Sequence, residues 1–143
     1  MKKFIFLLAI FMTFVNPVFS ATNWVQIFDN AYMDTNSLRK EYRYGLSSGS
    51  YYSIWTKWLN DGSKIFIDTE LQNKTKIWYY LSHIYFDCNS RLFDVKEVLA
   101  YDLNGNNIDD FIKSNSQISF FSVPPDSVIE TLYDKACLYA NGK

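Results

Sequence analysis

Residues 76–88 read KIWYYLSHIYFDC, and their side chains fall into two alternating sets. Successive side chains of an extended strand point to opposite faces of a sheet. One face carries Trp78, Tyr80, Ser82, Ile84, Phe86 and Cys88. The other face carries Ile77, Tyr79, Leu81, His83, Tyr85 and Asp87. Because both faces are largely apolar or aromatic, the pattern predicts a central strand covered on both sides, or one with an aromatic face at an interface.

Further strands are expected on both sides of this segment. Alternating or β-branched and aromatic patterns, separated by turn signals such as Asn104-Gly105, predict strands at 24–28, 51–59, 91–101 and 118–123. The alternation within 91–101 places one apolar set on a single face: Phe93, Val95, Leu99 and Tyr101. Two segments stay ambiguous. Within 32–41, residues 32–34 fit a strand and residues 36–38 fit a turn or a short helical turn, while 65–71 pairs back as a hairpin or forms a loop.

A helix is expected at the C-terminal end of the sequence. Ser127 and Glu130 form an S-x-x-E capping box after two prolines, which predicts a helix from Val128 to a stop at Asn141-Gly142. Apolar residues then recur with helical spacing at Ile129, Leu132, Tyr133, Ala136, Cys137 and Ala140. Strands followed by one helix predict an α+β fold, an antiparallel β-sheet with a C-terminal α-helix.

The first 20 residues are typical of an export signal. Two lysines precede the apolar run FIFLLAIFMTFV at 4–15, which is shorter than a membrane span. Cleavage between Ser20 and Ala21 is expected, and this leaves 21–143 as a single domain with no membrane span. With no Cys near the cut, we expect no lipoprotein, but an exported protein of the periplasm, the cell surface or the medium. The net charge of −1 disfavours a nucleic-acid partner, and the 48% hydrophobic content disfavours disorder.

The two cysteines of the chain, Cys88 and Cys137, both lie after the signal. An even count in an oxidising compartment favours one disulfide. A reactive or metal-binding pair is disfavoured, because the two residues have no C-x-x-C spacing. Since Cys88 belongs to a strand and Cys137 to the apolar stripe of the helix, the disulfide is expected to tie the helix to the sheet.

Several short motifs occur in an order that is similar to a known family. They are Trp24-Val25, Tyr32-Met33-Asp34 with Ser37, Ile54-Trp55, the run YFDCNSR at 85–91, and PDSVIE at 125–130 followed by Leu132 and Cys137. The chain resembles the surface-adhesin protein E domain family of exported bacterial proteins. It departs from that family at Asp126, where Gly is common, and in having no Cys for lipidation. The resemblance implies a sheet with a disulfide-tethered helix, and adhesion to host extracellular-matrix or serum proteins.

No catalytic, cofactor-binding or metal-binding residues are expected. His83 is the only histidine and has no nucleophile motif beside it, so we interpret it as a partly buried sheet residue. The segment from Asp102 has oxygen ligands at the first three alternate positions of a calcium loop, but Asn107 and Lys113 replace its glycine and its glutamate. A polar connection with an Asn-Gly turn is the preferred interpretation. Asp109-Asp110, as neighbours, do not suit a facing carboxylate pair.

The aromatic residues instead favour a binding function. Trp and Tyr are common anchors of protein interfaces. We therefore expect a non-enzymatic binding protein whose surface includes Trp55, Trp58, Trp78 and Tyr79. A sugar or a peptide would suit such a surface, as would a second copy of the chain. The alternative to an adhesin is a periplasmic or secreted module that binds another bacterial protein.

Overall fold

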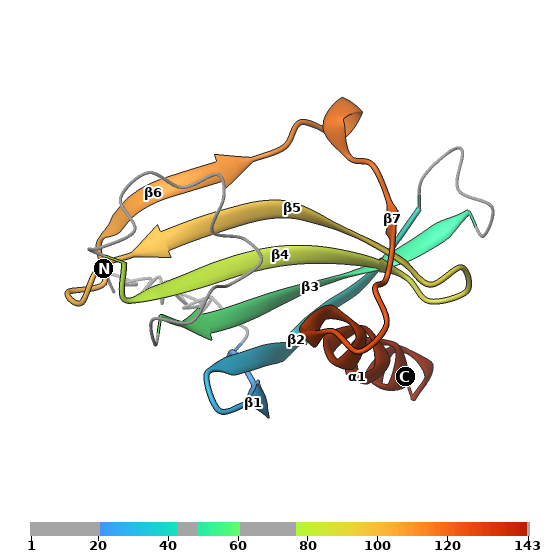
Figure 1. The fold of residues 1–143 in the computed structure, drawn as a ribbon, viewed down its shortest axis with the longest axis horizontal. Helices are drawn as coiled ribbons and strands as arrows, with labels where there is room; N and C mark the ends of the chain where they lie inside the picture. The colour runs from blue at the N-terminus through green and yellow to red at the C-terminus, as the bar shows by residue number, and fades with distance from the viewer. Residues whose placement is uncertain (1–20, 43–48, 61–76, 143) are drawn as a thin grey trace, which may run out of the picture.

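A single antiparallel sheet forms the framework of the computed structural model, which describes residues 21–42, 49–60 and 77–142. The strands are β1 (Trp24–Phe28), β2 (Ala31–Tyr42), β3 (Ser50–Leu59), β4 (Tyr79–Asp87), β5 (Leu92–Tyr101), β6 (Asn107–Ile112) and β7 (Phe121–Ser122). Six of them lie in the order β1-β2-β3-β4-β5-β6, while β7 pairs with the first residues of β5 (Figure 1). A short 3-10 helix, η2 (Asn115–Gln117), precedes β7, and α1 (Val128–Asn141) follows it.

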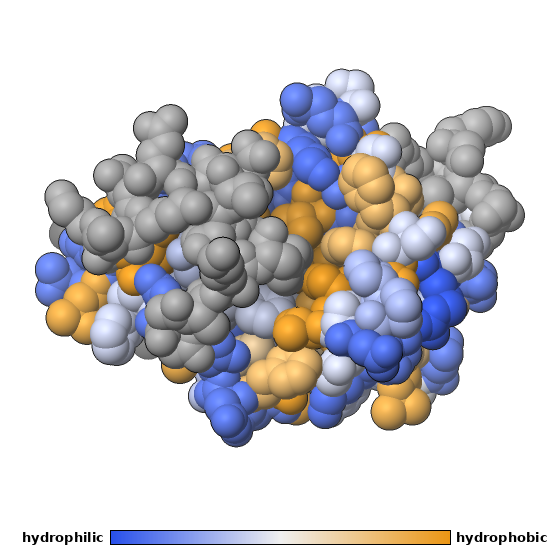
Figure 2. All heavy atoms as spheres, in the orientation of Figure 1, coloured by the Kyte–Doolittle hydropathy of each residue, from blue (hydrophilic) through white to orange (hydrophobic). Residues whose placement is uncertain are grey.

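The helix α1 covers one face of the sheet and closes the core. Its whole predicted stripe is buried, at Ile129, Leu132, Tyr133, Ala136, Cys137 and Ala140. The helix packs against β1, β2, β3 and β4, whose core residues include Met33, Ile54, Ile84 and Phe86. Burying a large apolar side chain is worth about 1.5–3 kcal/mol, so this stripe holds α1 in place. The outward side of α1 is mostly polar (Figure 2).

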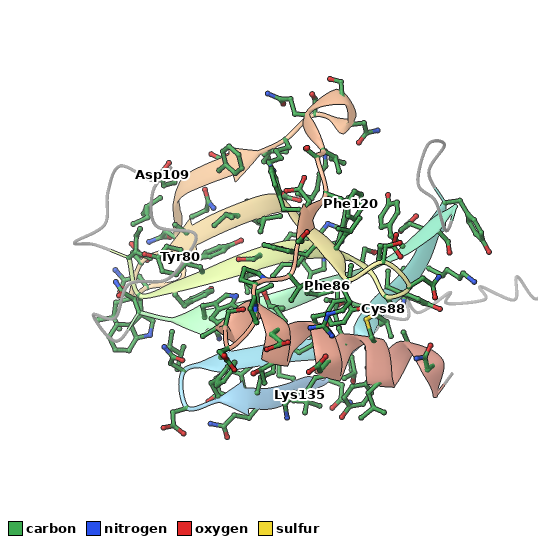
Figure 3. All side chains as sticks on the ribbon, turned by 45° about the vertical axis from the view of Figure 1, so that its right-hand side comes forward. Tyr80, Phe86, Cys88, Asp109, Phe120 and Lys135 are labelled. Atoms are coloured by element: carbon green, nitrogen blue, oxygen red, sulfur yellow. A yellow bond between two sulfur atoms is a disulfide. The ribbon has the colours of Figure 1, made fainter. Side chains whose placement is uncertain are left out.

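The start of α1 and its tether to the sheet confirm the sequence predictions. Ser127 is the N-cap, and its Oγ accepts the N–H of Glu130 at 3.1 Å. Cys88 and Cys137 form a disulfide with Cα atoms 5.7 Å apart (Figure 3). The Tyr133 hydroxyl donates to the carbonyl oxygen of Cys88 at 2.8 Å, a second link between α1 and the end of β4. The α+β fold with a disulfide-tethered helix is therefore confirmed.

The strand pattern of β5 differs from its prediction. Val95 pairs with Ile84 and Glu97 pairs with His83, so Lys96 is an extra residue at a β-bulge. A bulge shifts the alternation of side chains between faces. Val95 therefore lies on the helix side, whereas Leu99 and Tyr101 lie on the other side. The prediction of one shared face for Phe93, Val95, Leu99 and Tyr101 is wrong for this reason.

Other boundaries also differ from the sequence prediction. The expected strand at 118–123 is reduced to β7, and the polar segment after Asp102 contains the strand β6. The ambiguous 32–41 segment belongs to the long strand β2. The expected signal at 1–20, with Ser20, and the segment 65–71 lie outside the described residues. In the part of the chain that the structure describes, no helix has the length and apolar character needed to cross a membrane.

Candidate functional site

The candidate site is the part of the sheet face opposite α1 that β3, β4, β5 and β6 form, and we call it the open face. It consists of three rows of side chains that run across β3, β4, β5 and β6 in register. The first row is Trp55, His83, Glu97 and Ile112. The second row is Lys57, Leu81, Leu99 and Asp110. The third row is Leu59, Tyr79, Tyr101 and Asn107.

Apolar side chains dominate the open face, and solvent reaches them. The open-face residues of β3, β4 and β5 are all half-buried, and Ile112 at the sheet edge is 55% exposed. Helix-side residues of the same strands, such as Ile54, Tyr80, Ile84 and Val98, are only 0–1% exposed. A contiguous apolar patch of this kind marks an interaction surface more often than a solvated face.

Aromatic rings on the open face stack on one another across neighbouring strands. Trp55 and His83 stack with centroids 4.7 Å apart and planes 6° from parallel. Tyr79 and Tyr101 stack at 4.8 Å and 8°, and Lys57 Nζ lies 4.5 Å from the Tyr79 ring centre. Because at least one face of each ring is covered by a side chain of a neighbouring strand, and both faces of Tyr79 are, the rings present mainly edges outward. A sugar platform needs free ring faces, whereas positive ring edges suit the carbonyl, carboxylate and aromatic groups of a protein.

His83 lies in the middle of this face, between Trp55 and the edge of the Tyr85 ring. Burial, followed by the positive charge of Lys96, lowers the pKa of His83 to about 4. The imidazole is therefore neutral at physiological pH, and it contributes a stacking ring to the open face. No serine or cysteine nucleophile is hydrogen-bonded to it among the described residues. The sequence interpretation as a partly buried sheet histidine agrees with this position.

One end of the open face is covered. Tyr85 is only 8% exposed, because the Tyr51 ring lies 4.7 Å from it and Phe120 contacts Tyr51 at 5.6 Å. Burial is the main cause that raises the pKa of Tyr85 to about 12, with Tyr51 and nearby carboxylates adding to it. Phe120 comes from the connection between β6 and β7 (Figure 3). The accessible part of the face is therefore the three rows between Trp55 and Leu59.

A buried ion pair holds that connection in place. Asp94 is 2% exposed, and its carboxylate accepts from Lys113 Nζ at 2.5 Å and from the Ser119 N–H at 2.9 Å. Lys96 Nζ also donates to the Lys113 carbonyl oxygen. These contacts span the gap between β6 and β7 along the edge of β5. They keep Phe120 over Tyr51 and thereby set the boundary of the open face.

The four expected surface residues are divided by the structure. Trp55 and Tyr79 lie on the open face, in adjacent strands. Trp58 does not belong to a surface, because it points to the helix side, is 3% exposed and donates from Nε1 to Thr56 Oγ1 at 2.8 Å. Trp78 is 53% exposed, but it precedes Tyr79 by one position and so belongs to the opposite side. The expectation is thus corrected for Trp58.

Sequence reasoning missed several residues that complete the face, namely Leu59, Leu81, Leu99, Tyr101 and Ile112. The alternation of 76–88 already places Leu81 on the same face as Tyr79, so the sequence is sufficient to predict Leu81 as part of the surface. The alternation of 91–101 groups Leu99 and Tyr101 with Phe93 and Val95, whereas the bulge at Lys96 moves them to the opposite face. Ile112 was missed because β6 follows a polar turn and carries two aspartates in its six residues.

The polar segment beside β6 offers no metal centre within the described residues, where no group of three His, Cys, Asp or Glu converges. Asp102 Oδ1 accepts the N–H groups of Asn104 and Asn106, and its Oδ2 accepts the Asn106 side chain. The carboxylate therefore shapes the turn. Asp109 pairs with Ala100 and Asp110 with Leu99, so the two aspartates lie on opposite faces of the sheet. This separation does not suit a pair of facing carboxylates.

No family model matches the chain, and no curated protein or solved structure is similar enough to it to show a family. The resemblance to the surface-adhesin protein E domain family therefore stays a prediction from the motifs.

Proposed function

We propose that the chain is an exported, non-enzymatic protein-binding domain that works through its open face. The observation that carries this proposal is the set of half-buried side chains Trp55, Leu81, Leu99 and Tyr101, which lie on the sheet face that α1 does not cover. The disulfide supports export, because such bonds persist in oxidising compartments.

The class of ligand follows from the chemistry of the face. Upright rings and leucines offer an apolar centre, while Lys57, Glu97 and Asp110 place charges of both signs around it. Protein interfaces combine an apolar core with a polar rim in this way. The motif resemblance favours a host extracellular-matrix or serum protein as the ligand. The second candidate is another protein of the producing cell.

Binding assays on paired variants test the proposal. The exported protein would be passed over purified, immobilised matrix and serum proteins, with Trp55→Ala and Leu138→Ala as matched variants. Leu138 serves as the control, because it is an apolar side chain away from the open face, 73% exposed on the outward side of α1. We expect Trp55→Ala to weaken capture about ten-fold or more, as for an interface anchor, and Leu138→Ala to leave it unchanged. Equal effects of the two substitutions would contradict the proposal.

Antibody labelling separates the two ligand candidates. If intact producing cells are labelled, the domain lies on the surface and a host ligand is supported. Labelling only after permeabilisation would place it in the periplasm and support a partner from the same cell.

Mass spectrometry of the exported protein should show a chain that starts at Ala21. A chain that retains Ser20 and the preceding residues would contradict export by cleavage.

A further inference from the structure

We propose that the open face also binds a second copy of this chain, sheet against sheet, about a two-fold axis. This inference rests on the proposed function, because it names one partner for the same face. Its basis is the order of residues along the three rows. When a row faces the same row of a second copy in the opposite strand order, apolar residues meet apolar residues and a positive charge meets a negative one.

The axis that produces this match runs parallel to the strands, midway between β4 and β5. Rotation about it places β4 against the partner's β5 and β3 against the partner's β6, while each residue stays at the level of its own row. Two sheets that pack in this way lie about 10 Å apart, with strand directions within about 30°. The geometry therefore yields a sandwich of two sheets, with each α1 on an outer side.

The second row places opposite charges and leucines at facing positions of the two copies. Leu81 meets the partner's Leu99, and Lys57 meets the partner's Asp110. The symmetry repeats both contacts, so two leucine pairs lie at the centre and two opposite charge pairs lie at the rim. Opposite charges placed at a rim favour one register of association and disfavour others.

The other two rows agree with the same axis. Trp55 meets the partner's Ile112, and His83 meets the partner's Glu97, so no like charges oppose each other in the first row. In the third row, Tyr79 meets the partner's Tyr101, which brings ring edges of one copy against ring edges of the other. Ile112, 55% exposed in the single chain, becomes covered by an aromatic side chain.

Moving the axis by one strand destroys this match. An axis between β3 and β4 would place Lys57 against the partner's Leu81 and Asp110 against the partner's Gln26, since Gln26 lies in line with Lys57 through Tyr32. Neither charge would then meet an opposite charge. The arrangement of charges thus selects the axis between β4 and β5.

One consequence is competition. A subunit whose open face is covered by a second copy cannot use that face for another protein. Dilution favours the free face, and a high local concentration favours the dimer, so the fraction of chains that capture another ligand should decrease as the protein becomes concentrated.

Charge reversal tests the inference. Sedimentation equilibrium of the exported protein would compare the wild type with Lys57→Glu, Asp110→Lys, the double reversal, and Lys135→Glu on α1 as the control (Figure 3). We expect a wild-type dimer whose association weakens about ten-fold or more in each single variant, because like charges then meet twice per dimer. The double reversal should restore association to near the wild-type level. Lys135→Glu should leave it unchanged.

Two results would overturn the inference. One is a wild-type protein that stays monomeric at every concentration. The other is a dimer that tolerates both single reversals, or one that the double reversal fails to restore. In the first case, the capture assay with Trp55→Ala still decides whether the open face binds a different protein. Urea unfolding of each variant shows whether it folds, so that loss of association is attributed to the face itself.

Discussion

Removal of the disulfide has a large effect that the structure allows us to work out. In the double variant Cys88→Ala/Cys137→Ala, the cross-link is lost while the backbone stays able to make the Tyr133–Cys88 hydrogen bond. The packing of the helix stripe also remains. The native state should therefore persist with α1 on the sheet, and the loss of stability should report mainly the cross-link.

The size of that loss depends on the length of chain between the cysteines, which are 49 residues apart in the sequence. The chain-entropy account of disulfides then gives about 4 kcal/mol for the restricted freedom of the unfolded chain. With a urea slope of about 2 kcal/mol per molar, the midpoint of unfolding should fall by about 2 M. The slope itself should increase, because the unfolded chain without the cross-link exposes more surface.

Urea unfolding followed by tryptophan fluorescence and by circular dichroism measures both quantities. The wild type in the presence of a reductant is the matched control, and it should reproduce the loss seen in the variant. An unchanged midpoint and slope would refute the reasoning, since they would mean that the cross-link does not restrict the unfolded chain. A variant that folds without α1 would show instead that the packed stripe alone is too weak.

Four further substitutions, at three positions, test local features by urea unfolding. The pKa of His83 is depressed to about 4 in the folded chain, so the unfolded chain binds the proton first and stability falls as the pH drops from about 6.5 towards 4. His83→Phe should remove on the order of 2 kcal/mol of that fall, after allowance for solvent screening, and an identical fall would contradict the assignment. Asp94→Ala should cost about 3 kcal/mol, because it leaves Lys113 and the Ser119 N–H without their partner; a cost near zero would show that the pair is dispensable. Asp126 has φ +53°, so Asp126→Gly should be tolerated while Asp126→Val should cost about 1–2 kcal/mol, and equal stabilities would be the contrary result.

The C-terminal helix and its disulfide tether follow closely from local sequence signals. The Ser127 cap, the spacing of apolar residues in α1 and the position of Cys137 on the buried stripe are all properties of short segments, and each is found in the structure. Asp126, just before the cap, has a left-handed backbone with φ +53°, a conformation that glycine adopts without strain.

The candidate site is harder to predict from the sequence, because it depends on pairing between strands that are distant in the chain. A single extra residue, Lys96, reverses the faces of Leu99 and Tyr101, and no local pattern reveals it. Trp58 shows the same limit, since a tryptophan near a strand end suits either a surface or a core. Its burial is decided by the register of β3 against β4, which pairs it with the buried Tyr80.

The most direct test of the central claim is site-specific photocrosslinking in producing cells. A photoreactive phenylalanine analogue would replace Leu81 at the centre of the open face or, as the control, Leu138 on the outward side of α1. If the open face binds proteins, position 81 should yield a crosslinked product, either a doubled chain or an adduct with another protein, and position 138 should yield none. No product at position 81, or equal products at both positions, would contradict the account.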